Sequence, residues 1–480
     1  MKSHKHRGAS AQGQSIPASL QVILQSFAGC FTAPGFENFV ALISGWILCQ
    51  GRHCISRVIQ VAGGRGGAKH FSTLYRFLSR GRWSVDELGR GLFVALLRVL
   101  PEDIDAMVDD TLCRHRGPRI FGAGMHHDAV LSSYGRGAQA GRATFFSCGH
   151  CWVVLAVRVP LPWDLERGIA IPILFRLYRP KRLCDAASYR KRTELAHELV
   201  ALLESWIPPG YRLCMSGDAE YASRALVPKL ASATTFVGPI VMDAALYEPA
   251  GDYGGMGRPR KKGKRLDSPQ QMAASASRWR TITVCAYGRR IEVKVKERVC
   301  LWYTVTGVRL ARVVVSRDPK GRCADRAYFS TNPEMHAEEV LERFALRWLI
   351  EVSFRDVKQW MGSEDPQNGW SRGKRRGKKK PGPQARGERG KLAVQHTLPL
   401  AFTAYAVVVL WYLREGDAER DVSNRLKCAP WYRHKSAPAF GDMLVALRRE
   451  AWAVRLLKHH GKKRVSAKLK RLLPDALLAA

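Results

Sequence analysis

Acidic residues are scarce in this sequence. Its 480 residues include 41 aspartates and glutamates against 78 lysines and arginines, so the formal net charge is +37. A globular chain with this excess of positive charge needs a polyanionic partner, and nucleic acid is the usual one. A surplus of charge that serves solubility alone is disfavoured at this size.

Long hydrophobic runs are also missing. The most apolar segment, residues 398–413, is shorter than the about 20 residues that cross a bilayer, so we expect a buried helix there and no membrane partner. The first residues are polar and basic without an apolar run after them, which predicts no signal peptide. These absences favour a soluble, cytoplasmic protein.

A cysteine framework is absent as well. Twelve cysteines are scattered along a chain that is long enough to bury a core without disulfides, and we expect them to be reduced. Cys148-Gly-His-Cys151 has one zinc-like spacing, but a second ligand pair is missing and an apolar segment follows directly. We interpret this motif as the start of a buried strand.

The period of the apolar residues divides the chain. They recur at helical spacing up to about residue 100, then in strand-like runs around one amphipathic helix at 193–206, which indicates a mixed α/β sheet. Alternating β segments are expected at 281–286, 290–295, 300–305 and 310–315, and they indicate an inserted subdomain. The predicted segments are a helical N-terminal DNA-binding domain (1–100), the first part of a catalytic core (101–240), a β-rich insertion subdomain (241–327), the second part of the core with a basic loop at 372–391 (328–413), and a helical basic C-terminal region (414–480).

Two predicted strands end in aspartates. The strand at 104–108 runs into Asp109-Asp110-Thr111, and the strand at 211–215 runs into Gly217-Asp218, with a helix expected at 221–230. Active sites of α/β sheets tend to lie at such strand ends.

A third acid lies on a long helix expected at about 337–361. At 100° per residue, Phe344, Arg347, Glu351 and Lys358 lie within about 60° of one another on one face of it. The alternative is an ordinary solvated face in which Arg347 and Glu351 form an i,i+4 ion pair. The two strand-end aspartates upstream favour a functional face.

Three carboxylates in one cleft repel one another and do not all stay ionised at neutral pH without a cation. Two Mg²⁺ ions about 3.5–4 Å apart would resolve the repulsion, activate a water or a 3′-hydroxyl, and stabilise the leaving oxygen during attack at phosphorus. Arg347 and Lys358 suit the neighbouring phosphates. Asp109, Asp218 and Glu351 are therefore the predicted catalytic acids and metal ligands.

This order of motifs resembles the DDE transposases of bacterial insertion sequences. More narrowly, it is similar to the group with the signature Tyr-x2-Arg-x3-Glu-x6-Lys and a β insertion before the glutamate. The matching residues here are Phe344, in place of the tyrosine, with Arg347, Glu351 and Lys358. The resemblance spans about residues 105–362.

The resemblance implies an α/β, RNase H-like mixed sheet with helices that binds Mg²⁺ or Mn²⁺. It also implies cleavage and joining of double-stranded DNA at terminal inverted repeats, usually through a DNA hairpin, by a homodimer on DNA. The resemblance also implies a bacterial protein that is cytoplasmic and associated with the nucleoid. The missing tyrosine hydroxyl affects one phosphate contact and no metal ligand.

Some assignments stay open at this point. The Asp-x-Thr pattern favours Asp109 over Asp110, because strand alternation would direct Asp110 the other way. Glu220 is an alternative to Asp218, although Asp218 is closer to the strand end. Trp302 or Trp279 in the β insertion could stack on a flipped base, while core packing is the common role of a strand tryptophan.

Basic runs add further candidate contacts to the DNA backbone. The first contains Arg258, Arg260, Lys261 and Lys262, and the second is the loop at 372–391; the alternative is a solvated charge run. An RNase H-like nuclease that cleaves without strand transfer and a non-catalytic DNA-binding descendant remain competing functions. The complete set of acids disfavours the descendant.

Overall fold

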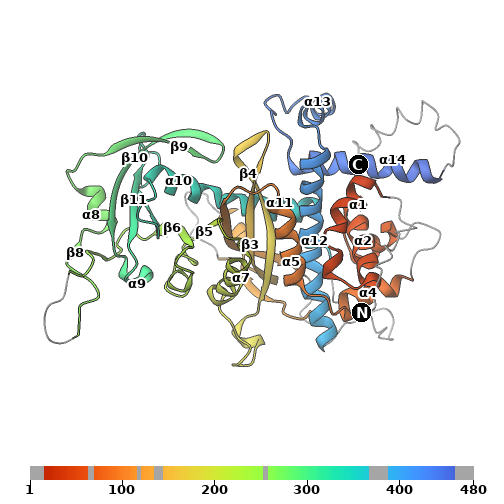
Figure 1. Cartoon of the computed structure of the whole chain (residues 1–480), viewed down its shortest axis with the longest axis horizontal. Coiled ribbons are helices and arrows are strands. Elements are labelled where there is room, and N and C mark those ends of the chain that lie inside the picture. Colours follow the sequence, from red (N-terminus) through yellow and green to blue (C-terminus); the bar gives the residue numbers. More distant parts are fainter. Residues whose placement is uncertain are drawn as a thin grey trace, which may run out of the picture. The chain divides into compact units, whose positions relative to one another are not determined.

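The structure is a computed structural model that describes residues 16–62, 70–115, 120–134, 144–251, 258–366 and 387–459 (Figure 1). The predicted basic loop lies outside the described residues up to residue 386, as does the basic tail at 462–471. The chain forms two compact units. Unit 1 comprises 1–98, 112–150 and 354–480, and unit 2 comprises 99–111 and 151–353.

Unit 2 is built on one large mixed sheet. Its strand order is β4-β3-β1-β5-β6-β12-β11-β10-β9, in which β1, β5 and β6 are parallel and the other described pairings are antiparallel. The strands are β1 (Asp103–Arg114), β3 (Phe146–Leu161), β4 (Asp164–Tyr178), β5 (Arg212–Gly217), β6 (Thr235–Ile240), β9 (Arg280–Ala286), β10 (Arg289–Cys300), β11 (Ala311–Arg317) and β12 (Arg326–Ser330). A separate two-stranded sheet pairs β7 (Leu246–Tyr247) with β8 (Arg265–Leu266).

The strands predicted as an insertion continue the core sheet. Residue Tyr328 of β12 pairs with Pro239 of β6, and β11, β10 and β9 follow by antiparallel pairing. The hydrogen-bonded ladder therefore runs without a break from β1 into the β-rich segment. The helices of unit 2 are α7 (Arg192–Trp206), α8 (Pro269–Ala274), α9 (Tyr303–Thr306), α10 (Ala337–Leu346) and the start of α11 (Trp348–Trp360).

Helix α10 covers one face of this sheet. Its apolar residues Val340, Leu341 and Ala345 pack in a buried cluster with residues of β6, β9, β10 and β11, such as Val237 and Val314. Burial of this stripe is the main force that holds the helix on the sheet. The last turn of α10 therefore has a fixed position just before Arg347.

Unit 1 is mostly helical. Its described helices are α1 (Ala18–Gln25), α2 (Ala33–Leu48), α3 (Ile55–Ala62), α4 (Phe71–Arg80), α5 (Val85–Leu96), α6 (Ala129–Tyr134), the rest of α11, α12 (Gly387–Glu415), α13 (Ala418–Cys428) and α14 (Phe440–His459). Strand β2 (Gly124–His127) pairs with the first residues of β3. Ser84 caps α5 by accepting a hydrogen bond from the Glu87 amide, and two acids lie in the first turn.

Helix α12 forms the core of unit 1. It is the one helix of the described chain that is long and apolar enough to cross a membrane by length and composition, and 89% of that window is buried. It contacts α1, α2, α4, α5 and α14. The ring of His396 stacks on Trp83 at 3.9 Å, and its Nδ1 lies 2.8 Å from the Leu78 carbonyl oxygen. The prediction of a buried helix at 398–413 is confirmed.

Three local predictions were wrong. Residues 221–230 form turns and a short 3₁₀ helix instead of an α-helix, because the Asp218 carboxylate accepts hydrogen bonds from the Glu220 and Tyr221 amides. Residues 303–306 form the helical turn α9 instead of continuing a strand. The predicted helix at 337–361 is divided at Arg347 into α10 and α11.

Candidate active site

Asp109 and Asp218 lie where the parallel pairing of two neighbouring strands ends. In the pairing of β1 with β5, Val108 is opposite Gly217, and each aspartate is the next residue along the chain. The predicted end of the first strand at residue 108 was wrong, because β1 continues through Asp109 to Arg114, whereas β5 ends just before Asp218. Their proximity also appears in the electrostatics, since Asp218 raises the pKa of Asp109.

The side chains of Asp109 and Asp110 have different partners. The Asp109 side chain is 12% exposed, and its Oδ2 accepts a hydrogen bond from Arg347. Asp110 contacts Arg192 instead, with its Oδ2 3.2 Å from Arg192 Nη1. Successive residues of a strand face opposite sides, which explains the division. Asp109 is therefore the aspartate that shares a partner with Glu351.

Arg192 also holds Glu220. Its guanidinium donates to Glu220 Oε1 at 2.8 Å and lies 2.7 Å from Oε2. The Tyr221 hydroxyl donates to Asp110 Oδ1 at 3.4 Å. One arginine at the start of α7 therefore gathers the two acids that were the alternatives to Asp109 and Asp218.

Arg347 joins Asp109 to Glu351. Its Nη1 donates to Asp109 Oδ2 at 2.7 Å, and its Nη2 donates to Glu351 Oε1 at 2.9 Å. Although burial alone would lower it, the pKa of Arg347 is raised by Asp109, Glu351 and Asp218. Two of the three predicted acids therefore contact one guanidinium, and the third acts on it electrostatically.

A second ion pair fixes the helix that carries Arg347. Arg343, one turn earlier on α10, donates to Asp105 of β1, and Arg158 of β3 contacts the other oxygen of Asp105 at 3.3 Å. The pairs Asp105–Arg343 and Asp109–Arg347 have the same spacing of four residues on strand and helix. Two aspartates of β1 thus anchor the end of α10 and the start of α11.

The buried site requires more positive charge than Arg347 provides. Burial, together with the smaller effects of Asp218 and Asp110, raises the pKa of Asp109 to about 8 against the opposing effect of Arg347. Buried acids that lie this close together tend either to keep a proton or to bind a cation. Carboxylate oxygens are the ligands that Mg²⁺ prefers. The donor chemistry therefore fits a divalent metal ion.

The positions of these side chains do not yet form a metal site. In the described part of the chain, no three Asp, Glu, His or Cys side chains are grouped closely enough to hold a metal ion. At Asp109 and Glu351 the reason is visible, because the Arg347 guanidinium binds one oxygen of each acid. The residue types fit the ion, and Arg347 is the cationic side chain that contacts two of them.

Lys358 and Phe344 have their own contacts. The Lys358 ammonium donates to the Leu112 carbonyl oxygen at 2.8 Å and lies 3.9 Å from Glu364. The Phe344 ring packs against Tyr328 at 4.7 Å, and the Arg347 guanidinium lies 5.8 Å from its centroid. Phe344 thus supports the guanidinium from one side. Contact of either residue with DNA stays a prediction.

The two tryptophans considered for base stacking have protein partners. Trp302 is 6% exposed and packs edge-to-face on Phe329, with ring centroids 5.0 Å apart. Trp279 is half-buried, with Arg317 4.2 Å and Lys296 4.7 Å from its ring. These contacts favour packing roles, and stacking on a base stays a prediction for both.

Three of the four basic residues predicted near 258 to contact DNA are solvent-exposed. Arg258, Arg260 and Lys261 are exposed, which suits contact with a phosphate backbone. Lys262 is half-buried and its ammonium lies 3.9 Å above the Tyr247 ring. Their contact with DNA stays a prediction as well.

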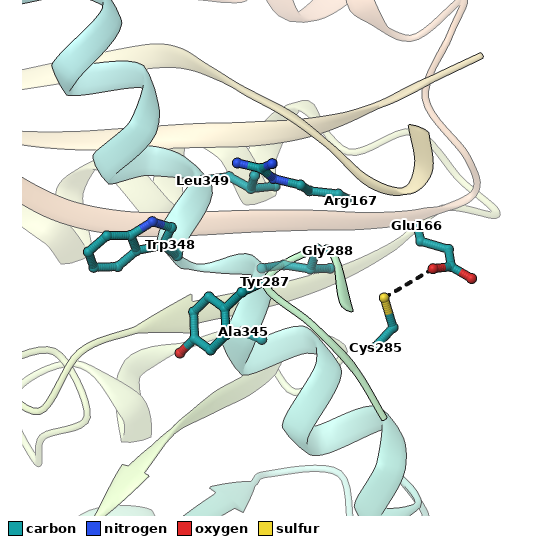
Figure 2. A pocket seen from close by; sticks show the side chains of 9 residues that line it. Glu166, Arg167, Cys285, Tyr287, Gly288, Ala345, Trp348 and Leu349 are labelled. Carbon is teal, nitrogen blue, oxygen red and sulfur yellow. Dashed lines mark hydrogen bonds between the residues drawn. The ribbon is translucent and has the colours of Figure 1, made fainter. Parts of the chain in front are cut away.

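Two exposed aromatic residues, one of them on the helix that carries Glu351, were not predicted from the sequence. Figure 2 shows Tyr287 and Trp348 close together beside a small pocket of about 100 Å³, which Cys285, Glu166 and Arg167 also line. Their rings are 6.5 Å apart and nearly perpendicular. Tyr287 has φ 56° in the turn between β9 and β10, a left-handed conformation that is uncommon for a residue other than glycine.

A signal for one of them was present in the sequence. That signal is the position of Trp348, which directly follows Arg347 of the motif. In the structure its side chain is 47% exposed, which is unusual for tryptophan. Tyr287 could not have been found in this way, because its position depends on the pairing of β9 with β10. The pocket lies well below the about 300–1,000 Å³ of small-molecule sites, so a metabolite site is disfavoured.

Residues 26–294, more than half of the chain, match the DDE superfamily endonuclease family. The chain therefore belongs to this family, which implies a nuclease that acts on DNA and generally uses divalent metal ions. The matched range includes Asp109 and Asp218 and ends before Glu351. A comparison with curated proteins found no match.

Proposed function

We propose that the protein is a DNA transposase that cleaves the ends of an insertion sequence and joins them to target DNA. Asp109, Asp218 and Glu351 would be its catalytic acids and the ligands of two divalent metal ions. The observation that carries this proposal is the shared guanidinium of Arg347, because it links acids from β1 and α11 next to the acid that follows β5.

The chemistry follows from the acids and their surroundings. Metal ions bound to these carboxylates would activate a water or a 3′-hydroxyl and stabilise the leaving oxygen. The chain's own contribution is to hold the three acids at fixed positions. Asp110 and Glu220 are paired with Arg192 instead of Arg347, so they are not among the proposed ligands. Arg347 and Lys358 are suited to hold phosphate oxygens.

Exposed aromatic residues beside Glu351 would contact the DNA near the scissile bond. Trp348 is three residues from Glu351 and half-exposed, and Tyr287 is 62% exposed. Stacking of a base on an aromatic ring is favourable and independent of sequence. Of the aromatic residues considered, this pair is more accessible to a base than Trp302.

Helix α4 of unit 1 has the properties of a DNA-binding surface. One face buries Leu74, Phe77 and Leu78 in the helical core. The opposite face exposes Tyr75, Arg76 and Arg80, and the helix contains no acid. Such a face is complementary in charge to a phosphate backbone and narrow enough to enter a major groove. Tyr75, Arg76 and Arg80 are therefore the residues of the predicted N-terminal domain that we propose to contact DNA.

Strand transfer separates a transposase from a simple nuclease. The test uses a labelled duplex with the element's end and flanking sequence, a supercoiled target plasmid, and Mg²⁺. A denaturing gel would reveal cleavage, and a native gel would reveal the labelled strand joined to the plasmid. We expect both products, and a protein dimer bound to the paired ends.

Other outcomes would change the proposal. Cleavage without joining would favour an RNase H-like DNA nuclease that belongs to the same family. Binding of the end without cleavage, with Mg²⁺ and with Mn²⁺, would favour a non-catalytic DNA-binding protein. Joined product in the presence of EDTA would contradict the metal-dependent chemistry.

A further inference from the structure

The guanidinium of Arg347 binds the same oxygens that a metal ion would need. Its two terminal nitrogens donate to Asp109 Oδ2 at 2.7 Å and to Glu351 Oε1 at 2.9 Å. The side chain is 15% exposed, so this contact is largely shielded from water. One positive group therefore occupies one oxygen of each of two proposed ligands.

Arg347 is also incompletely satisfied in this position. Its Nε is buried and has no hydrogen-bond partner among the described residues. A buried donor without a partner costs free energy, so the arrangement is less stable than a fully bonded guanidinium would be. A metal ion that binds the two acids, or a phosphate that binds the guanidinium, therefore has less to overcome than it would with a fully bonded arginine.

We propose that Arg347 is an internal competitor of the metal ion. In the metal-free protein it holds Asp109 and Glu351 together and closes the metal site. A divalent ion binds these acids only in the conformation in which the guanidinium has left them. The inference rests on the proposed function, because it takes Asp109 and Glu351 to be metal ligands.

The reason lies in the energetics of competition. The guanidinium balances one of the two negative charges and occupies an oxygen of each acid, so a metal ion must replace existing ion pairs instead of meeting free carboxylates. The apparent affinity for the ion falls by the fraction of molecules in the open conformation. Removal of the guanidinium should therefore strengthen metal binding, although it removes a contact with the ligands themselves.

The chain contains a matched control for this effect. Arg192 bridges Asp110 and Glu220 in the same manner, at 3.2 Å and 2.7 Å, and belongs to the same unit. Its two acids are not proposed ligands. Arg192→Gln therefore removes an arginine that bridges two carboxylates near the site without freeing a proposed ligand.

The experiment measures binding of Mn²⁺ alone to the full chain by the electron paramagnetic resonance signal of the free ion. If the open conformation is populated at no more than about one part in ten, Arg347→Gln binds Mn²⁺ at least about tenfold more tightly than the wild type. Arg192→Gln stays within about twofold of the wild type, since its acids are not ligands. Arg347→Lys, which can reach one acid at a time, is intermediate and serves if the glutamine variant does not fold.

Unchanged or weaker Mn²⁺ binding in Arg347→Gln, in a folded protein, would overturn the inference. A similar gain in Arg192→Gln would also overturn it, because the effect would then be one of general charge. Failure of the proposed function is distinguishable in the same assay. If Asp218→Asn and Glu351→Gln leave wild-type Mn²⁺ binding intact, the assignment of the metal ligands is wrong and the inference falls with it.

Discussion

Replacement of Asp109 by asparagine should stabilise the metal-free protein, and increasingly so as the pH rises. Asparagine is close in shape to the protonated carboxyl group, and it carries no charge. Burial raises the pKa of Asp109 to about 8 from 3.8. The folded state therefore binds a proton more tightly than the unfolded state between these two pH values.

The sign of the effect follows from this linkage. The stability that the protonated Asp109 contributes is fully present below its unfolded pKa of 3.8, and it is lost as the pH rises towards about 8. Each pH unit in this window is worth about 1.36 kcal/mol. Between pH 5 and pH 7.5, the advantage of Asp109→Asn over the wild type should grow by about 3 kcal/mol.

The assay is urea unfolding in EDTA, followed by circular dichroism at several pH values between 5 and 7.5. Asp110→Asn is the control, because it removes a partly exposed ion pair with Arg192 and should lower stability by up to about 1 kcal/mol at neutral pH. A difference between Asp109→Asn and the wild type that does not change with pH would show that folding does not raise the pKa of Asp109. A growing loss of stability would show that the ion pair with Arg347 outweighs burial.

Three further predictions concern the aromatic and basic residues. Trp302→Ala should destabilise the protein by about 3–5 kcal/mol in denaturant unfolding, because the indole is buried, whereas Trp348→Ala should leave stability nearly unchanged and lower the rate of DNA cleavage. Arg76→Ala combined with Arg80→Ala should weaken duplex binding in a gel-shift assay in EDTA, while Arg90→Ala, whose charge is offset by Glu87 at 3.9 Å, should not. If about six to ten phosphates are contacted, binding should fall about 10³–10⁵-fold between 50 and 200 mM salt, as measured by fluorescence anisotropy. Equal effects of the two tryptophan variants, equal effects of the arginine variants, or salt-independent binding would each contradict the corresponding assignment.

The sequence was most informative where local pattern and tertiary structure agree. The strand before Asp218, the helix at 193–206 and the start of the strand that contains Asp109 were predicted close to their observed bounds, whereas the end of that last strand was predicted six residues too early. Cys148-Gly-His-Cys151 does lie in the buried strand β3, as expected. In these segments the apolar period is set by one buried face, so the sequence alone carries the information.

The failures come from interactions that a periodic pattern does not contain. The turn after Asp218 replaces a helix because a side-chain oxygen takes the backbone amides. The break at Arg347 divides a continuous helical pattern at the residue that pairs with Asp109 and Glu351. The roles of Arg192 and Tyr287 depend on contacts between residues far apart in the chain, which spacing cannot reveal.

The proposed site assigns DNA cleavage to Asp218 and not to its near neighbour Glu220. The most direct measurement compares Mg²⁺-dependent cleavage of a labelled element end by Asp218→Asn and Glu220→Gln, with DNA binding measured on the same preparations. We expect Asp218→Asn to bind DNA and to lose cleavage, and Glu220→Gln to retain both, because Glu220 is paired with Arg192 and does not contact the guanidinium that joins Asp109 to Glu351. Cleavage that persists in Asp218→Asn, or that is lost only in Glu220→Gln, would contradict the assignment of the site.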